Sequence, residues 1–351
     1  MIDLLTPSTI LWSRYRIVDL VGQGGMGAIY QAEDLRLEGR LCAIKEVVPD
    51  LDASKEYQEQ SQAAFHREAS VLARLDHTNL PKVSDFFLYN GRNYLVMDYV
   101  PGQDLREIIE NARHKGEFIP EDQVLAWAEQ LLNAVEYLHH QEPPVLHRDI
   151  KPSNIKLTPN GIIKLVDFGL VKLLQPDDNR TITVLQGRAT IQYAPLEQIG
   201  GDVGFTDVRS DIYSLGATVY QLLTNDPPPD AKTRYIKTKE NPRLSIRNIN
   251  SHVSSQTEQA VLHALGLHPE ERPVTVDQFR QELLGNIPII INGKVVNGWH
   301  FAVWRNRVLL ALIAALLTLA AILTFTPGIS SGQVDAEALQ SNPVSEASSQ
   351  Q

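Results

Sequence analysis

Residues 146–154 read LHRDIKPSN and bring several chemically active side chains into one short stretch. These are His147, Arg148, Asp149, Lys151 and Asn154, and Pro152 favours a turn among them. The stretch is either one half of an active site or a charged loop in solvent. Which of the two holds depends on whether the rest of the chain supplies partners for a phosphate, a metal ion and a base.

A glycine-rich segment, GQGGMG at residues 22–27, lies between two strand-like runs. Glycine lets backbone N–H groups approach phosphate oxygens because no Cβ atom intervenes. A tight hairpin explains the same glycines equally well. A dinucleotide-binding fingerprint requires the last glycine to open a helix, whereas the AIYQAED that follows continues as a strand. The pattern therefore disfavours a dinucleotide site.

A lysine and a glutamate in the following segments form a second candidate pair. In CAIKEVV, Lys45 alternates with Ala43 and so faces the same side as small apolar residues. Taken alone, such a lysine could also lie in solvent on an edge strand. In QSQAAFHREASVLARL, helical spacing places Glu68 on the apolar face with Phe65. A carboxylate on an apolar face needs a buried partner, which predicts that Glu68 meets Lys45.

The sequence DFG at residues 167–169 follows the strand-like run GIIKLV. An aspartate at a strand end, followed by glycine, can coordinate a metal while the loop beyond it moves. Asn154 is placed to supply a second oxygen ligand. Oxygen ligands suit Mg²⁺ or a similar ion such as Mn²⁺, which retains water and bridges substrate phosphates. We therefore predict that Asp167 and Asn154 bind this ion.

Composition limits the alternatives. The chain has 351 residues and a net charge of -10, which argues against a nucleic-acid-binding protein. Cys42 is the single cysteine, so no intrachain disulfide and no Cys-rich metal site can form. The N-terminal MIDLLTPST lacks the basic and apolar regions of a cleavable signal peptide.

Periodicity divides the chain into a β-rich part with one helix, up to residue 100, and a helical part after Pro101-Gly102. The run IIINGKVV beyond these parts predicts a small hairpin. The tail is rich in Ser, Gln and Ala, which is typical of disorder. The predicted divisions are a lead segment 1–12, a β-rich lobe 13–100, a helical lobe 101–285, a connector 286–307, an apolar helix 308–325 and a disordered tail 326–351.

The apolar run from Val308 to Phe325 carries no charged residue and would extend roughly 27 Å as a helix. This is close to the ~30 Å hydrocarbon core of a bilayer and predicts a single transmembrane helix. Arg305 and Arg307 precede the run, and no Lys or Arg follows it. The positive-inside rule then places the N-terminal part in the cytoplasm and the short tail outside. The alternative is a buried core helix, although this run lacks a polar face.

The ordered set of motifs from about Arg14 to Leu284 resembles the eukaryotic-type protein-kinase family. It comprises the glycine loop, the AIK lysine, the helix glutamate, HRDxKxxN and DFG. GQGGMGAIY most resembles bacterial membrane-anchored serine/threonine kinases. The resemblance implies a bilobal α+β fold, with a β-rich N-lobe and a mainly helical C-lobe.

The resemblance also implies roles for individual residues in Mg-ATP-dependent phosphoryl transfer. Lys45, positioned by Glu68, would hold the α- and β-phosphates. Asp149 would orient the acceptor hydroxyl and take its proton, and Lys151 would contact the γ-phosphate. Met97 would be the gatekeeper beside the hinge 98–100. The implied ATP-binding residues are Gly22, Gln23, Gly24, Gly25, Gly27, Ile29, Ala43, Lys45, Met97, Asp98 and Val100.

Arg148 beside Asp149 resembles kinases that are activated by phosphorylation of the loop after DFG. Thr181 and Thr183 are the candidate acceptors, with Thr190 ranked third because it more closely matches a threonine that contacts the catalytic aspartate. An unmodified threonine-rich loop is the alternative.

One departure from the family pattern lies in YAPLEQ, where Leu196 replaces the proline of Ala-Pro-Glu. Glu197 remains, and Arg272 is available for the buried ion pair that the family makes there. The residues with implied structural roles are Arg148, Glu197, Asp211 and Arg272.

The resulting hypothesis is a serine/threonine kinase that acts on proteins at the cytoplasmic membrane face, with a homodimer for trans-autophosphorylation as a family-based expectation. A non-catalytic scaffold that retains the fold is the main alternative. A ligand receptor is disfavoured by the short outer tail, and a small-molecule phosphotransferase by the full HRD and DFG set.

Overall fold

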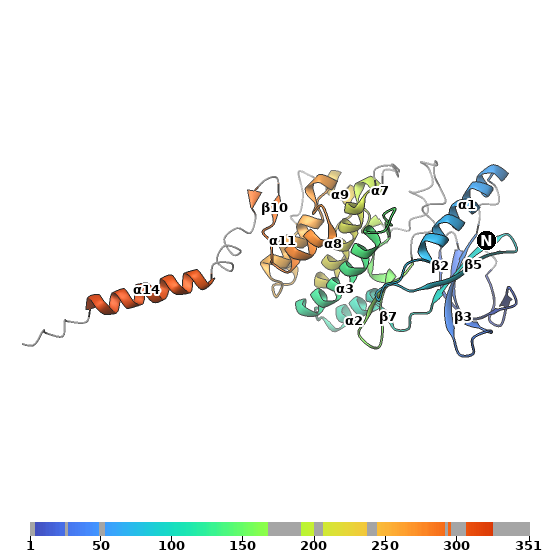
Figure 1. The fold of residues 1–351 in the computed structure, drawn as a ribbon, viewed down its shortest axis with the longest axis horizontal. Coiled ribbons are helices and arrows are strands. Elements are labelled where there is room, and N and C mark those ends of the chain that lie inside the picture. Colours follow the sequence, from blue (N-terminus) through green and yellow to red (C-terminus); the bar gives the residue numbers. More distant parts are fainter. Residues whose placement is uncertain are drawn as a thin grey trace, which may run out of the picture. The chain divides into compact units, whose positions relative to one another are not determined.

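The computed structural model describes residues 4–24, 27–48, 53–167, 191–199, 206–236, 244–291, 294–295 and 307–325. The chain divides into two compact units, Met1–Phe301 and Ala302–Gln351, which are considered separately (Figure 1). Within the first unit the strands of one lobe and the helices of the other are clearly separated, as the α+β prediction required.

The N-lobe is built on an antiparallel sheet with the strand order β1-β2-β3-β4-β6-β5. In β3 every second side chain is buried, which is the pattern of a strand with one face on a core. The β5–β6 hairpin turns at Asn90 and Gly91 with φ of 49° and 75°, the left-handed geometry that Asn-Gly favours. The bounds are β1 Ile10–Leu11, β2 Tyr15–Gly24, β3 Gly27–Asp34, β4 Leu41–Val47, β5 Val83–Tyr89 and β6 Arg92–Asp98.

The N-terminal residues that were expected to form a separate lead belong to this lobe. Strand β1 pairs with β2, and Leu11 is buried in the apolar cluster on one side of the sheet. The ring of Trp12 stacks on Phe87 with 4.8 Å between ring centroids. The boundary near residue 12 is therefore not a domain boundary in the structure.

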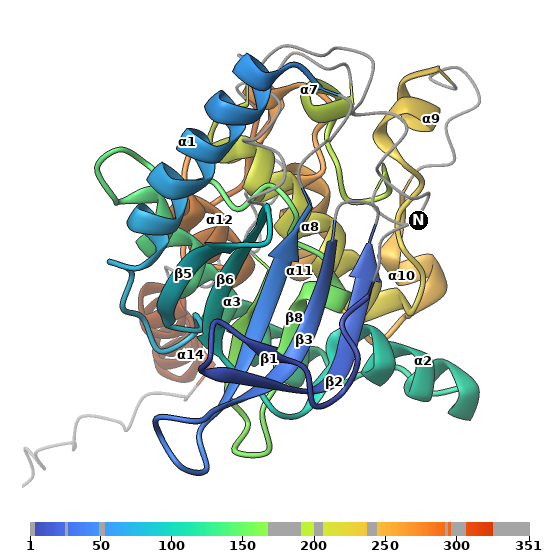
Figure 2. The same ribbon diagram turned by 90° about the vertical axis from the view of Figure 1, so that its right-hand side faces the viewer.

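The helix α1, Lys55–Leu72, lies alongside β5 and β6 and packs against both strands (Figure 2). It begins at Ser54, whose side chain accepts a hydrogen bond from the Tyr57 N–H and so caps the first turn. Phe65, Ala69 and Leu72 form its buried face. This packing carries Glu68 toward the inner side of the lobe.

The C-lobe surrounds α8, Val208–Thr224, which is buried at every position from Ser210 onward. A helix that is buried on all sides forms the centre of the lobe. Helices α3, Glu121–His139, and α11, Ser255–Ala264, pack directly on it. The other elements are α2 Leu105–Lys115, α7 Leu196–Ile199, α9 Ala231–Ile236, α10 Ile246–Ile249, α12 Val276–Leu283 and the short 3₁₀ turns η1 Pro152–Asn154 and η3 Pro269–Glu271.

A small antiparallel sheet, β7-β8-β9, follows residues 146–154 in the C-lobe. Its strands are β7 Gln103–Asp104, β8 Ile155–Leu157 and β9 Ile163–Leu165. Strand β8 follows η1 directly, and β9 ends just before Asp167. The predicted metal ligands therefore stand at the ends of neighbouring strands.

The connector contains the predicted hairpin, with β10 Ile290–Ile291 antiparallel to β11 Lys294–Val295. In the second unit, α14 spans Arg307–Phe325 and so covers the apolar run. Within the part of the chain that the structure describes, where α14 side chains are included only for residues 311–320, no helix is long and apolar enough to cross a membrane. Membrane insertion of residues 308–325 stays a prediction from the sequence.

Candidate active site

The backbone of the stretch 146–154 is anchored by the buried carboxylate of Asp211 on α8. Asp211 Oδ2 accepts the His147 N–H at 2.9 Å, and Oδ1 accepts the Arg148 N–H at 2.8 Å. A third donor is His139 Nε2 at the end of α3, 2.9 Å from Oδ2. Burial alone would raise the pKa of Asp211, but these donors lower it below its usual value. The carboxylate is therefore ionised at neutral pH.

The side chains of Asp149, Lys151 and Asn154 contact one another. Asp149 Oδ2 accepts a hydrogen bond from Lys151 Nζ at 2.9 Å and another from Asn154 Nδ2 at 3.0 Å. Asn154 Nδ2 also bonds to the Asp149 carbonyl at 2.9 Å. Because the amide nitrogen is used in this way, the amide oxygen of Asn154 is the atom that can take a cation. The Asp149 side chain retains 17% exposure, so an acceptor hydroxyl can reach it.

On the N-lobe side, Lys45 on β4 forms a close ion pair with Asp167, which lies 122 residues further along the chain. Asp167 has φ of 62°, a left-handed conformation that is uncommon for a residue other than glycine. The Val166 N–H donates to the Asn154 carbonyl at 2.8 Å and so ties the segment before Asp167 to η1. Lys45, Asp167 and Asn154 thus belong to one site.

The contact predicted between Lys45 and Glu68 is not formed in this structure. In the described chain the ion pair of Lys45 is with Asp167, and Glu68 Oε2 is buried without a hydrogen-bond partner. Burial raises the pKa of Glu68 to about 7, although the positive charges of Lys45 and Arg148 act in the opposite direction. The Lys45 ammonium acts on Glu68 only through space.

The described part of the glycine segment lies at the adjoining ends of β2 and β3, where Gly24 pairs with Gly27. A Cβ atom on Gly27 would lie 1.8 Å from the Glu46 carbonyl oxygen, so the neighbouring strand excludes any other residue there. A Cβ atom on Gly22 or Gly24 would meet nothing within 4 Å. The open side of these two glycines is where a phosphate could approach the backbone.

The predicted adenine side is assembled by strand pairing. Ala43 on β4 is the direct neighbour of Met97 on β6, and Ile29 on β3 is the neighbour of Lys45. Met97 and Val100 are buried, whereas Asp98 is exposed and its N–H donates to the Lys82 carbonyl at 3.0 Å. Ile29, Ala43 and Met97, to which the resemblance gives ATP-binding roles, therefore lie in the same sheet as Lys45.

The ion pair predicted between Glu197 and Arg272 is present. Arg272 Nη1 and Nη2 lie 2.7 and 3.0 Å from the two carboxylate oxygens of Glu197, a bidentate arrangement. The guanidinium also donates to the carbonyls of Gly266, Arg209 and Leu267 at 2.8, 3.1 and 2.9 Å. Burial would raise the pKa of Glu197, but the hydrogen bonds from Arg272 lower it below the ordinary value. Leu196 leaves this pair intact.

The metal prediction is compatible with the oxygen donors present. Among the described residues no cluster of three or more His, Cys, Asp or Glu side chains could hold a metal ion. Asp167 and Asn154 offer one carboxylate and one amide oxygen, held together through the Val166–Asn154 hydrogen bond. So small a ligand set suits Mg²⁺, which takes few protein ligands and completes its shell with water and substrate phosphates.

Several predicted residues lie outside the described part of the chain. These are Gly25 of the glycine segment and the candidate phosphorylation sites Thr181, Thr183 and Thr190. Their roles stay predictions.

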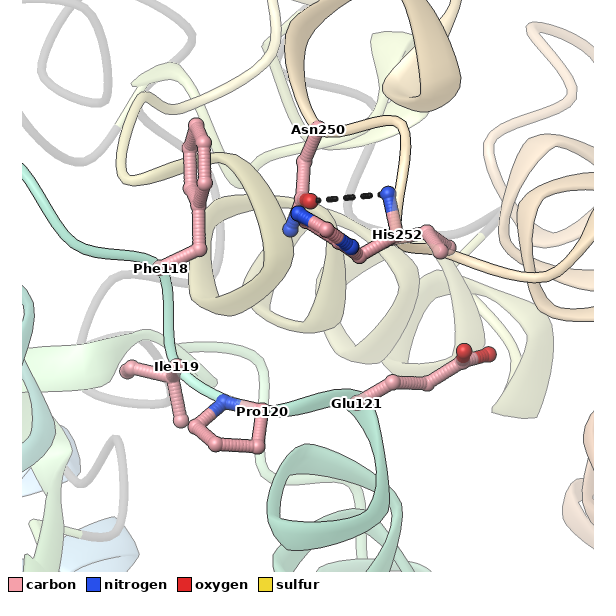
Figure 3. Close-up of a pocket in the computed structure, with 7 residues that line it drawn as sticks. Phe118, Ile119, Pro120, Glu121, Asn250 and His252 are labelled. Atoms are coloured by element: carbon pink, nitrogen blue, oxygen red, sulfur yellow. Dashed lines mark hydrogen bonds between the residues drawn. The ribbon is translucent and has the colours of Figure 1, made fainter.

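A separate pocket lies in the C-lobe between the α2–α3 connection and the α10–α11 turn (Figure 3). Its volume is about 320 Å³. The Glu121 carboxylate at its edge accepts hydrogen bonds from the Ser254 N–H and hydroxyl at 3.0 and 2.7 Å, so it anchors the start of α11. None of the predicted site residues lines this pocket. Its lining consists of Phe118, Ile119, Pro120, Glu121, Asn250, His252 and Val253.

Among the described residues, His139 contributes a contact to the site that the sequence analysis did not identify. It stands 72 residues before Asp211 in the chain, and its donation to that carboxylate is visible only in three dimensions. The available signal was a histidine at the end of an amphipathic helix, close before the catalytic stretch.

The site thus combines a lysine from the β-rich lobe with an aspartate, an asparagine and a second lysine from the helical lobe. A model of the protein kinase domain matches residues 15–284. The chain therefore belongs to the protein kinase family.

Individual relatives agree with this assignment. A probable serine/threonine-protein kinase of Streptomyces coelicolor is 33% identical over 282 residues, which cover 78% of this chain and 40% of that protein. Serine/threonine-protein kinase PknB of Mycolicibacterium smegmatis is 32% identical over 290 residues, covering 80% and 44%. The chain thus spans less than half the length of these two relatives. Among solved structures, the apo form of PpkA-294 is similar with a TM-score of 0.65 at 30% identity, covering 80% of this chain and 99% of that one.

Proposed function

We propose that this protein is a serine/threonine kinase that transfers the γ-phosphate of ATP to hydroxyl groups of protein substrates. The observation that carries the proposal is the convergence of Asp149, Lys151 and Asn154 beside the Lys45–Asp167 ion pair. The names of the relatives, which are serine/threonine-protein kinases, support the same activity. A kinase-fold scaffold is less consistent with a site in which all these side chains are retained.

Each side chain has a task that its position allows. Asp149, partly exposed, orients the acceptor hydroxyl and takes its proton as the new bond forms. Lys151, 2.9 Å from that carboxylate, holds a positive charge where negative charge gathers on the transferred phosphoryl group. Lys45 supplies the corresponding charge from the N-lobe. To do so, the Lys45 ammonium exchanges part of its contact with Asp167 for phosphate oxygens.

Asp167 and the amide oxygen of Asn154 are the residues that would hold Mg²⁺. The ion supplies neutralisation of the phosphate charge. The hydrogen bonds from Asn154 to Asp149 would hold the metal-binding residue at a fixed distance from the residue that binds the acceptor hydroxyl.

Regulation and location form a second part of the proposal. Thr181 or Thr183 becomes phosphorylated by a second copy of the chain, and Arg148 then pairs with the phosphate. The protein works at the cytoplasmic face of a membrane, with residues 308–325 as the anchor. The uncharged apolar run from Val308 to Phe325 supports anchoring.

The deciding experiment incubates the full chain with Mg²⁺, γ-labelled ATP and a generic basic protein. Native protein, Asp149→Asn and the exposed control Asp76→Asn are compared, and labelled residues are mapped by mass spectrometry. Transfer by native and control, and loss in Asp149→Asn, supports a kinase. ATP binding without transfer by any of the three would support the scaffold instead.

The same experiment tests regulation by phosphorylation, and a membrane fractionation tests anchoring by residues 308–325. Label on Thr181 or Thr183 supports regulation by phosphorylation, and label elsewhere refutes it. Native protein is expected in the membrane fraction of a bacterial lysate, and Leu316→Arg, which places a charge within the run, in the soluble fraction. Recovery of both in the soluble fraction would end the anchoring proposal.

A further inference from the structure

A second buried carboxylate lies on the outer face of the N-lobe sheet, one residue after Lys45. Glu46 on β4 is 1% exposed. Successive side chains of a strand point to opposite faces, so Glu46 points away from the side on which Lys45 meets Asp167. It meets Tyr30 and Tyr94 of the apolar cluster on the outer face. A carboxylate in such surroundings is costly unless its oxygens are hydrogen-bonded.

Three side chains donate to this carboxylate. Glu46 Oε1 accepts hydrogen bonds from Arg92 Nη1 at 2.9 Å and from the Tyr94 hydroxyl at 2.8 Å, and Oε2 accepts one from the Tyr30 hydroxyl at 3.1 Å. Burial raises the pKa of both tyrosines, so both hydroxyls keep their protons at neutral pH and donate. The Tyr30 hydroxyl also accepts the Leu5 N–H at 3.1 Å, which fixes its direction.

The donors come from both neighbours of β4 in the sheet, since Tyr30 belongs to β3 and Arg92 and Tyr94 belong to β6. Tyr94 is the direct partner of Glu46 across the β4–β6 pair, whereas Tyr30 pairs with Ile44 and reaches Glu46 diagonally. A slip of either neighbour by one residue would turn its tyrosine to the other face of the sheet. The carboxylate therefore helps to fix the register of three strands.

This register matters because the same strands carry the predicted phosphate contacts. Ala28, the direct partner of Glu46 on β3, follows the glycine segment. Gly27 approaches the Glu46 carbonyl oxygen so closely that a Cβ atom would lie 1.8 Å from it. Lys45 is the preceding residue on β4. The position of β3 against Glu46 thus sets where the glycine segment lies relative to Lys45.

We propose that Glu46 is a positioning residue of the nucleotide site, supported by Tyr30, Tyr94 and Arg92. By holding β3 and β6 against β4, it keeps the glycine segment and Lys45 at the spacing that binds nucleotide phosphates. It acts from the far face of the sheet and touches no nucleotide. The inference rests on the proposed function for the identity of the ligand, but binding of a nucleotide tests it apart from phosphoryl transfer.

The test measures binding of AMP-PNP, an ATP analogue with an imido-linked terminal phosphate, to the full chain with Mg²⁺ by calorimetry. Tyr30→Phe and Tyr94→Phe each remove one hydroxyl donor and keep the ring. Tyr15→Phe is the matched control, because Tyr15 is buried in the same cluster and its hydroxyl donates to the Asp85 carboxylate at 2.8 Å.

We expect the Kd for AMP-PNP to rise roughly 3- to 10-fold in Tyr30→Phe and Tyr94→Phe, within the effect of losing one hydrogen bond to a charged group. The Kd of Tyr15→Phe should stay within about 1.5-fold of native, although it loses a comparable bond. In the kinase assay, KM for ATP should rise in parallel while kcat at saturating ATP stays within about twofold, the signature of lost ground-state binding. Glu46→Gln should raise the Kd at least as much as Tyr94→Phe.

An unchanged Kd in both Tyr30→Phe and Tyr94→Phe would overturn the proposal. An equal rise in Tyr15→Phe would also overturn it, since general loosening of the cluster would then explain the effect. If Glu46→Gln fails to fold, the tyrosine variants decide. A native protein that binds AMP-PNP without transferring phosphate from ATP would refute the kinase proposal, while the Kd values would still confirm or overturn the role of Glu46. A native protein that binds no nucleotide would overturn both.

Discussion

Replacement of Glu68 by glutamine should make the protein more stable at neutral and alkaline pH. Glu68 Oε2 is buried without a hydrogen-bond partner, and the pKa of the carboxyl is raised from 4.5 to about 7. A shift of this size corresponds to about 3 kcal/mol of unfavourable free energy for the ionised group. Glutamine has nearly the same shape but no charge, so it avoids that cost.

The sign of the pH dependence follows from the direction of the shift. Because the folded pKa lies above the unfolded one, the folded state holds the proton more tightly. The cost of ionised Glu68 is absent below about pH 4.5, grows as the pH rises to about 7, and stays constant above that. The stability difference between Glu68→Gln and native protein should therefore increase by about 3 kcal/mol from about pH 4 to about pH 8.

Urea unfolding followed by far-ultraviolet circular dichroism measures this difference. Glu59→Gln is the matched control, because Glu59 lies on the same helix and is exposed. Its stability difference from native protein should vary little with pH. A Glu68→Gln difference that stayed constant over the range, or that favoured native protein at high pH, would refute the assignment of a raised pKa. Glu68 is thus a buried carboxyl group whose ionised form lowers the stability of the fold.

Three further predictions concern stability and nucleotide binding. Arg272→Met should lower the free energy of unfolding by about 3–5 kcal/mol, because it leaves the buried Glu197 carboxylate without its arginine partner. The control Lys82→Met, which breaks an exposed ion pair with Asp76, should lower it by less than about 1 kcal/mol. A smaller loss in Arg272→Met than in the control would contradict the burial argument. The pKa of Glu197 is lowered on folding, so the stability that this carboxylate contributes is present above its unfolded pKa. That stability should be lost as the pH falls through the folded pKa. The free energy of unfolding of native protein and of Glu197→Gln, measured from neutral to acid pH, would show this loss. Gly27→Ala should force β3 and β4 apart at Glu46 and lower the free energy of unfolding. Gly22→Ala should leave the free energy of unfolding unchanged and raise KM for ATP. Equal destabilisation of the two variants would show that the close approach of Gly27 to Glu46 does not determine stability.

Local patterns in the sequence were sufficient to predict most of the strands and helices of the fold. Alternation of apolar residues predicted the β-rich N-lobe, and the run IIINGKVV predicted the β10–β11 hairpin, since both patterns depend on neighbouring residues only. The same holds within residues 146–154, where Asp149, Lys151 and Asn154 are close in the chain and so meet after a single turn. What the pattern could not predict was the partner of Lys45. That choice depends on where α1 packs and on the left-handed backbone at Asp167, neither of which leaves a local signal.

The contacts that sequence reasoning missed are also the ones that shape the motif it identified. Arg148 adopts its strained conformation beside Asp149 because Asp211, 63 residues later, accepts its N–H. The same carboxylate also accepts a hydrogen bond from His139, which precedes the motif. Residues 146–154 therefore have the chemistry of a catalytic loop but not, by themselves, its geometry. The C-lobe helices impose that geometry through one ionised carboxylate, so substitutions at α3 or α8 should change catalysis even where they touch no substrate.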